Sequence, residues 1–248
     1  MSVGIIEWPA EMVQGTLFVH QRHNIPASVL FEAAFNRQAT ATQENTNPQF
    51  GRSGMASVQD RDHVLSVNLQ PGRCDINLNS VHNPNKFTGS GKIVNVGESI
   101  EIVKTAMMAL VPMIGDTARL AFSTRFALGA KSRADANKSL LSVMPYKISL
   151  GDEEDFLLQA NWQTNVASHK INRLVRWSSE SLVMSLEQMV PGLSPQVINS
   201  EAIVGVVNLD FNTWPGHTKF TADKALDVVD ALVAETMKAR KNNLRFRS

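Results

Sequence analysis

Four side chains in this sequence are of the types that catalyse hydrolysis: Asp62, His63, Asp75 and Asp210. Carboxylate and imidazole groups act as general acids and bases when a fold brings them within hydrogen-bond reach of a substrate. The spacing of these four along the chain does not by itself require them to meet. They are the candidate catalytic residues of one hypothesis, an enzyme of unrecognised type such as a hydrolase or nuclease.

A second set of side chains could bind phosphates. On a strand, Arg173 and Trp177 would share one face while Lys170 and Arg176 would share the other, so no single basic face forms. Cations beside an aromatic ring can bind nucleic acid, although an exposed strand face that carries a few charges is the commoner explanation, and cations also complement the C-terminal end of a helix. The candidate binding residues are Lys170, Arg173, Arg176, Trp177, Lys238, Arg240, Lys241, Arg245 and Arg247.

The glycine-rich segment at residues 88–93 does not have the spacing of a nucleotide site. A phosphate-binding P-loop needs a glycine five residues before its Gly-Lys pair and a Ser or Thr after it, and here those positions hold Lys86 and Ile93. A dinucleotide fingerprint would need a small residue where Val94 stands. The spacing predicts a structural loop.

Metal and thiol chemistry have no local motif in the sequence. No two histidines show the spacing that places both imidazoles on one helical face around zinc, and no Gly-x-Ser-x-Gly segment occurs. The one cysteine, Cys74, falls in a predicted strand, where a small buried hydrophobic group is the simpler explanation. We therefore predict no metal site and no cofactor.

Composition predicts an ordinary globular chain. The 248 residues are 43% hydrophobic and 19% charged, with a formal net charge of +1. Such a chain buries roughly 70–75% of its unfolded surface without disulfides or a structural metal. The single cysteine and an N-terminus without a basic segment ahead of an apolar stretch predict a cytoplasmic location. No apolar run reaches the roughly 20 residues of a membrane-spanning helix, so we expect no membrane partner.

Hydrophobic alternation predicts most of the strands. Residues 70–73, Gln-Pro-Gly-Arg, carry the signature of a type II turn, which predicts a hairpin between two of them. The predicted strands cover residues 15–22, 28–41, 64–70, 73–80, 117–128, 156–166, 171–186 and 202–213.

Apolar residues at three- and four-residue steps predict the helices. One runs from Glu98 to Val111 and is stopped by Pro112 and Gly115, a shorter one covers 134–143, and the last begins after Thr221 and extends to about residue 240. Strand runs closed by helices predict an α+β fold with a largely antiparallel sheet. We expect one compact unit over residues 1–248, with two similar sub-halves, 1–115 and 116–248, each followed by an amphipathic helix.

Residues 42–59 do not fit this pattern, because they are polar and poor in large apolar groups. They are either a mobile functional loop or an edge strand. The sequence leaves both alternatives open.

The order of elements in the second half resembles another group of proteins. An alternating strand led by Arg119 is followed by further strands and by Val206 to Thr213 before the closing helix. In this order, residues 98–240 resemble a sporadically distributed family of uncharacterised prokaryotic proteins of about 250 residues. The resemblance implies an α+β fold and no established catalytic residues.

These observations favour a non-enzymatic protein that acts by binding, as part of an assembly or as a homo-oligomer. Its expected partner is a protein or a second copy of the chain. A nucleic-acid-binding subunit that uses the basic strand and tail is the first alternative, and the unrecognised enzyme is the second.

Overall fold

The structure is a computed structural model that describes residues 8–19, 24–47, 49, 51–60, 62–81, 88–149, 155–166, 169–188, 196–214, 219–242 and 244. Only the backbone is described for residues 186–188 and 196–198. The strands are β1 (Ala10–Val19), β2 (Ala41–Asn47), β3 (Gly51–Asp60), β4 (His63–Gln70), β5 (Arg73–Ser80), β6 (Thr117–Ala130), β7 (Leu157–Val166), β8 (His169–Gln188) and β9 (Gln196–Thr213). The helices are α1 (Ala27–Phe35), α2 (Val96–Ile114), α3 (Arg133–Val143) and α4 (Ala222–Lys241).

The described strands form one sheet in the order β2-β3-β4-β5-β1-β6-β9-β8-β7. Every neighbouring pair is antiparallel. The predicted α+β class with a largely antiparallel sheet is therefore confirmed. Strands β1 and β6, the first strands of the two sequence halves, pair with each other in the middle of the sheet. The prediction of two similar sub-halves goes beyond this strand order and stays a prediction.

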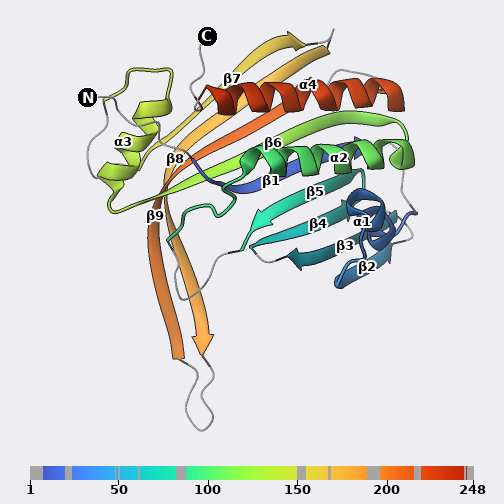
Figure 1. Cartoon of the computed structure of the whole chain (residues 1–248), viewed down its shortest axis with the longest axis horizontal. Coiled ribbons are helices and arrows are strands. Elements are labelled where there is room, and N and C mark those ends of the chain that lie inside the picture. The colour runs from blue at the N-terminus through green and yellow to red at the C-terminus, as the bar shows by residue number, and fades with distance from the viewer. Residues whose placement is uncertain are drawn as a thin grey trace.

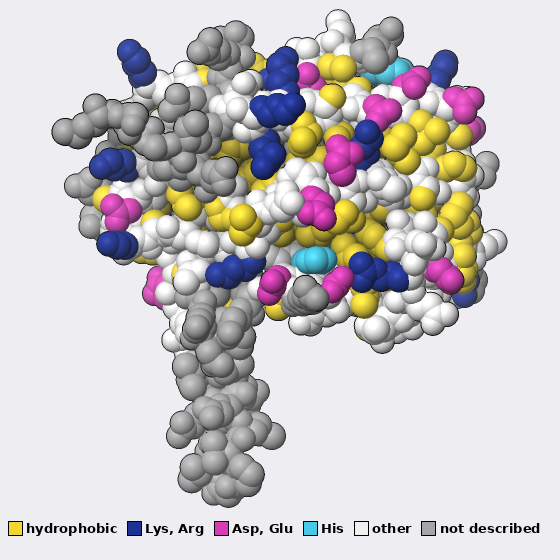
Figure 2. All heavy atoms as spheres, viewed as in Figure 1, with side chains coloured by type: hydrophobic (Ala, Val, Ile, Leu, Met, Phe, Trp, Pro, Cys, Tyr) yellow, Lys and Arg dark blue, Asp and Glu magenta, His cyan; other side chains and the backbone are white. Residues whose placement is uncertain are grey.

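The four helices of the described chain lie against one face of the sheet, which we call the helix face. In Figure 1, α2 and α4 run across the sheet next to one another, with α1 and α3 near opposite ends. The main core lies between these helices and the inward side chains of the strands, among them Leu17, Ile76, Phe122 and Phe211, which are fully buried. Figure 2 shows charged side chains of both signs interspersed among apolar ones in the same view.

We call the opposite side of the sheet the open face, because no helix in the described chain packs against it. Directly opposed residues of antiparallel strands share a face, so the register assigns every strand side chain to one face or the other. Thr16 opposes both Asp75 and Ala121, and Ala121 opposes Asn212. Gly15, the residue before Thr16, faces Met107 of α2 and so lies on the helix face. Thr16 and the residues opposed to it therefore lie on the open face.

The segment at residues 28–41 is the clearest error of the sequence prediction. It forms helix α1 instead of a strand, with Ala27, Leu30, Phe31 and Ala34 buried. Those positions follow helical spacing, but the same short apolar segment also satisfies an alternating pattern, so periodicity alone could not separate the two. The helix ends at Asn36, whose φ of 51° is the left-handed conformation that often closes helices.

Other boundaries differ in smaller ways. Strand β1 begins at Ala10, earlier than predicted, and residues 20–22 lie outside the described chain. Helix α2 contains Pro112 and continues to Ile114, so the prediction that proline stops it is wrong and only Gly115 ends it. Thr221 occupies the N-cap of α4, but its side chain makes no capping hydrogen bond.

The polar segment at residues 42–59 belongs to the sheet. It supplies most of β2 and β3, and β2 is one of the two edge strands of the described sheet, with all seven of its residues exposed. The edge-strand alternative is therefore the one that the structure shows. Strands β8 and β9 are longer than predicted, and beyond Ser181 and Ile203 they pair only with each other. Figure 1 shows this two-stranded arm projecting from the body of the protein.

Candidate binding face

The four candidate catalytic residues lie at three separate places in the fold, because only Asp62 and His63 are neighbours. Asp62 lies in the turn between β3 and β4, and His63 begins β4 on the helix-face side of the register. Asp75 of β5 and Asp210 of β9 both lie on the open face. Because β1 and β6 lie between them, strands β5 and β9 are about 14 Å apart, and Asp210 is also two residues along β9 from the position level with Asp75. The structure brings none of the four together into one pocket.

Each of the two open-face carboxylates already accepts hydrogen bonds from its neighbours. The Thr16 hydroxyl donates to Asp75 at 2.6 Å, and Arg73 Nε donates to the same carboxylate at 2.8 Å. Asp210 accepts from Ser123 at 3.3 Å and from Asn212 at 3.2 Å. These contacts give both carboxylates a structural role in holding the open face in shape.

The basic strand divides between the two faces, as its alternation predicts. Arg173 lies on the helix face, where its guanidinium is 3.5 Å from the Glu235 carboxylate of α4. Trp177 is fully buried on the same face and packs edge-on against Trp162 at 6.1 Å. Lys170 and Arg176 lie on the open face. Only these two of the four are placed to meet a ligand there.

The basic residues of α4 lie on the helix side of the molecule. Lys238 Nζ is 3.8 Å from a Glu235 oxygen, and Arg240 lies beside the first turn of α2 near Gly97. Lys241 is exposed in the last turn. The predicted residues Arg245 and Arg247 lie outside the described chain. The structure thus does not join the α4 cations and Lys170 into one surface.

The open face is dominated by amide and hydroxyl side chains. Amides project from it in eight of the nine strands, all but β6, and β6 supplies Ser123. The amide residues are Gln14, Gln43, Asn45, Asn47, Gln59, Asn68, Gln70, Asn77, Asn79, Gln159, Asn161, Gln163, Asn165, Asn172, Asn208 and Asn212. Each amide offers donors and an acceptor, so this surface can exchange many hydrogen bonds with a polar ligand.

Several of these polar groups are held in place by contacts with one another. Asn172 donates to the Asn212 carbonyl oxygen at 3.1 Å, and Asn77 donates to the Ser66 hydroxyl at 3.4 Å. Asn172, Asn212 and Asn77 are each less than a tenth exposed although no described helix covers them. Lateral packing between strands therefore orders this part of the face before any ligand arrives.

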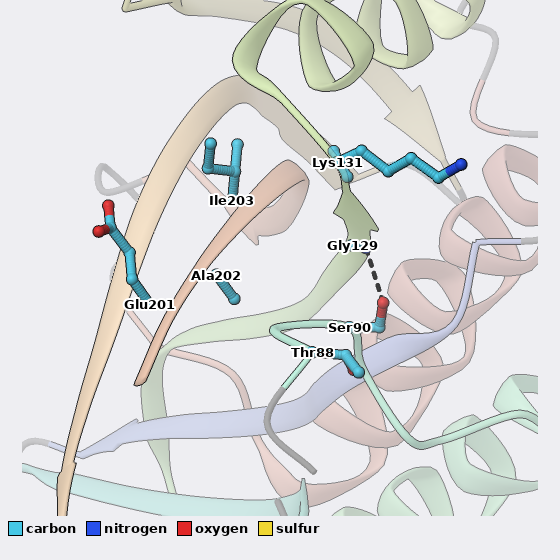
Figure 3. Close-up of a pocket in the computed structure, with 8 residues that line it drawn as sticks. Thr88, Ser90, Gly129, Lys131, Glu201, Ala202 and Ile203 are labelled. Carbon is cyan, nitrogen blue, oxygen red and sulfur yellow. Dashed lines mark hydrogen bonds between the residues drawn. The ribbon is translucent and has the colours of Figure 1, made fainter. Parts of the chain in front are cut away.

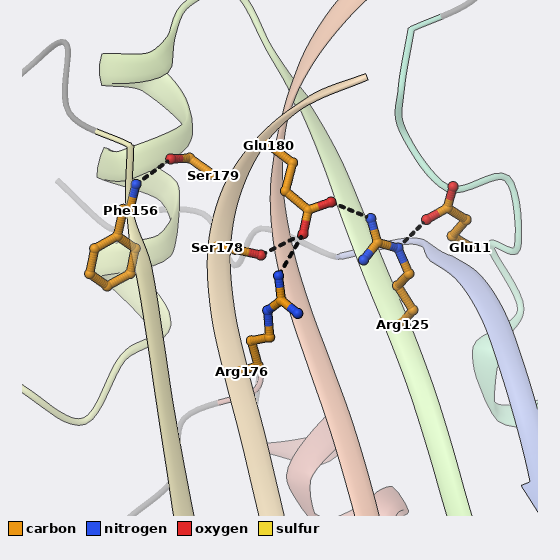
Figure 4. Close-up of polar contacts among 7 residues, drawn as sticks. All are labelled: Glu11, Arg125, Phe156, Arg176, Ser178, Ser179 and Glu180. Carbon is orange, nitrogen blue, oxygen red and sulfur yellow. Dashed lines mark hydrogen bonds and ion pairs between the residues drawn. The ribbon is translucent and has the colours of Figure 1, made fainter. Parts of the chain in front are cut away.

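An ion-pair network crosses the open face near one end of β1. Arg125 of β6 donates to Glu11 at 2.5 Å and to Glu180 at 2.7 Å, as Figure 4 shows. Glu180 also accepts from Ser178 at 2.6 Å and lies 3.8 Å from Arg176. The network ties β1, β6 and β8 together and leaves each of these charges with a partner.

The surroundings of this network shift the pKa values of two of its members. Burial raises the pKa of Glu180, but hydrogen bonds from Arg125 and Ser178 and the charge of Arg176 outweigh it, so the pKa is lowered overall. Burial lowers the pKa of Arg125, and its hydrogen bonds to Glu180 and Glu11 reverse that effect and raise it. Both groups therefore keep their charges more firmly than they would in water.

Aromatic rings and cations alternate at the other end of the face. Phe18 of β1 opposes Arg73 of β5 and Arg119 of β6. The two guanidinium carbons lie 5.4 Å and 5.3 Å from the centre of the Phe18 ring. Lys170 Nζ lies 4.7 Å from the centre of the Trp214 ring at the end of β9. We call these five residues the cation–aromatic row.

A pocket of about 640 Å³ lies where the glycine-rich segment crosses the sheet. Ser90 accepts a hydrogen bond from the Gly129 amide at 2.7 Å, and a Cβ on Gly89 would lie 2.4 Å from Val204. Figure 3 shows Lys131 and Glu201 extending to opposite sides of this pocket. The segment packs against β6 and β9, which agrees with the structural loop that its spacing predicts, and its polar groups do not converge on one point.

The described residues contain no group of three or more His, Cys, Asp or Glu side chains that could hold a metal ion. Cys74 is fully buried on the helix face, and burial together with the nearby Asp75 charge raises the pKa of its thiol to about 12. A thiol in this state is a packing group and not a nucleophile.

Comparison of the chain with protein-family models, curated proteins and solved structures gave no match. The resemblance to a prokaryotic family therefore stays a prediction. Among the described helices, none combines the length and apolar character needed to cross a membrane.

Sequence reasoning did not find the cation–aromatic row or the amide-rich face. The row draws on five strands that are far apart in the chain, so no local motif marks it. The signal that was present is the recurrence of Asn, Gln and Ser at every second position, as in β5 and β7. Alternation of this kind indicates a polar sheet face, and it adds to the hydrophobic alternation that predicts the strands themselves.

Proposed function

We propose that this protein is a non-enzymatic binding protein whose recognition surface is the open face of the sheet. One observation carries the proposal: amide and hydroxyl side chains cover that face from β2 to β7, while all four described helices lie on the other side. The apolar residues of this face lie near one end, where Ala127, Val204 and Val206 are buried and the glycine-rich segment contacts Val204. The polar remainder of the face does not need a covering layer for stability. It is suited to a long polar ligand.

The arrangement of charged groups supports binding over catalysis. Asp75, Asp210 and Glu180 each accept hydrogen bonds from neighbouring side chains and hold the surface together. A general base needs an accessible lone pair near the reacting proton, and both oxygens of Asp75 and of Glu180 accept hydrogen bonds from the protein itself. A cytoplasmic location remains part of the proposal, supported by a single cysteine that forms no disulfide.

The side-chain amides allow a direct test by nuclear magnetic resonance. Uniformly ¹⁵N-labelled protein is titrated in turn with a thymidine 20-mer, a uridine 20-mer, heparin, a neutral β-glucan and poly-glutamate. We expect one polymer to shift the NH₂ signals of open-face residues such as Asn77, Asn172 and Asn208. The matched controls are Asn36, Asn95 and Asn242, which lie at helix ends and should not move. Shifts confined to the controls, or no shift with any polymer, would contradict the proposal.

Self-association through a sheet edge is a second candidate function, favoured by β2. All seven residues of this edge strand are exposed, and the strand pairs only with β3 in the described chain. An exposed edge can add a strand from a second copy or from another protein. Light scattering of the intact protein over a wide concentration range tests the homo-oligomer, and a Thr42→Pro substitution should abolish any dimer that forms through β2. A strictly monomeric protein at high concentration would contradict it.

A further inference from the structure

The cation–aromatic row runs straight across the open face. Register places Phe18 between Arg73 and Arg119, and the Trp214 amide donates to the Lys170 carbonyl oxygen on the next strand. Trp214 lies two residues after Asn212, which opposes Ala121, and Arg119 lies two residues before Ala121. The row therefore spans β5, β1, β6, β9 and β8, about 19 Å at the usual strand spacing.

The charges in this row are less neutralised than those elsewhere on the face. Within the described chain neither Arg119 nor Lys170 forms an ion pair, and Arg119 Nε is buried without a hydrogen-bond acceptor. Arg125, in contrast, is held between two carboxylates, and Arg73 is paired with Asp75. The row thus places two cations without an ion pair within one line across the open face.

The aromatic members of the row are accessible. The Trp214 residue is 39% exposed, and Phe18 is partly exposed on the same face. Flat rings that are partly open to solvent next to unneutralised cations form the combination that binds unpaired bases and the phosphates joining them. Neutral glycans use rings but do not need the cations, and sulfated glycans use cations but do not need rings for stacking.

We propose that the cation–aromatic row binds single-stranded nucleic acid, with Arg119 and Lys170 contacting phosphates, Trp214 stacking on a base and Phe18 holding Arg119 in place. A single strand fits better than a duplex, because the Trp214 ring can stack only on a base that is free of pairing. This inference rests on the proposed function of the open face and adds the chemical class of its ligand. Of the binding residues predicted from the sequence, the row contains only Lys170, and the cations of α4 are not part of it.

The test measures fluorescence anisotropy of labelled thymidine and uridine 20-mers with the full-length protein. We expect Arg119→Gln and Lys170→Gln each to weaken binding at least about fivefold. Each should also reduce the slope of log K against log salt by about 0.7, the value for one phosphate contact on a single strand. Trp214→Leu should weaken binding at least about fivefold without changing that slope, because stacking releases no counterion.

The matched control removes the same charge from the helix side of the protein. Lys224 and Lys241 are exposed on α4, so Lys224→Gln and Lys241→Gln should leave the affinity within about twofold. Circular dichroism and thermal unfolding confirm that each variant is folded. Three results would overturn the inference. They are equal losses of affinity in the control and row variants, unchanged affinity in the row variants, and binding to heparin without binding to either oligonucleotide.

The two proposals fail in different ways. If the amide signals of the open face respond to heparin, β-glucan or poly-glutamate but not to an oligonucleotide, the ligand class is wrong and the binding face stands. If no polymer shifts those signals and no oligonucleotide binds, both proposals are wrong.

Discussion

Met107 of α2 lies directly over Gly15 of β1. A Cβ built on Gly15 would lie 2.3 Å from Met107 Sδ, and both residues are buried at the centre of the helix face. The close approach of helix and strand at this point depends on the missing side chain. It sets how closely α2 covers the middle of the sheet, on the side opposite the open face.

Substitution of Gly15 by alanine should therefore destabilise the fold. Overpacking a filled core typically costs about 1–3 kcal/mol, and the neighbouring methionine must move to relieve it. Urea unfolding measures the cost. In a Met107→Ala background the same substitution should cost clearly less, because the clashing atoms are gone. An equal cost in both backgrounds would show that Met107 is not the limiting contact.

The Glu180 carboxylate should make stability depend on pH in acid. Its pKa is lowered in the folded protein, so it adds stability above its ordinary value of about 4.5, and this contribution is lost as the pH falls through the lowered pKa. Glu180→Gln should lower the free energy of unfolding by about 1–3 kcal/mol at pH 7, since it removes charged hydrogen bonds. The difference from the unsubstituted protein should vanish in strong acid.

A matched substitution separates this effect from a general loss of charge. Glu101 is exposed on α2 and lies 3.9 Å from Lys104. Glu101→Gln should change stability by no more than about 0.5 kcal/mol at any pH. If the two variants showed the same pH profile, the network around Arg125 would not be the source of the effect.

The Cys74 thiol should be almost unreactive in the folded protein. It is fully buried, and its pKa is raised from 9.0 to about 12, which lowers the thiolate fraction roughly a thousandfold. Alkylation at pH 8 should be at least about a hundred times slower than in 6 M guanidinium chloride. In a Cys74→Ser background, a cysteine introduced by Ser185→Cys on the exposed arm should react rapidly in the native state. Fast native labelling of Cys74 would contradict its placement.

Gly72 in the β4–β5 turn should resist replacement. Its φ of 76° is a conformation that L side chains adopt only with strain. Gly72→Ala should destabilise the protein by about 1 kcal/mol, and Gly72→Asn should cost less because asparagine tolerates positive φ better. Thermal unfolding of both variants gives the comparison, and a larger loss for asparagine would argue against this cause.

Local signals were sufficient where a structure is formed by neighbours in the chain. The hairpin around Pro71 and Gly72 was predictable because turn chemistry and two alternating strands agree on it. Helix α1 was not, because its short apolar segment satisfies both helical and strand periods. Only burial against α2, β3 and β4 selects the helix. The prediction that Pro112 ends α2 was wrong for a related reason, because tertiary packing of this helix outweighs one missing backbone hydrogen bond.

The sequence by itself determined the α+β class, most strands and helices, and the split of Lys170 and Arg173 between opposite faces. These properties depend on periodicities of two and 3.6 residues, which are readable along the chain. Only the tertiary structure decided that Arg73, Phe18 and Arg119 lie side by side, or that Asp75 and Asp210 stay apart. Strand order and register decide which residues become such neighbours. Both depend on pairing between segments that are distant in the chain, so no local sequence pattern predicts them.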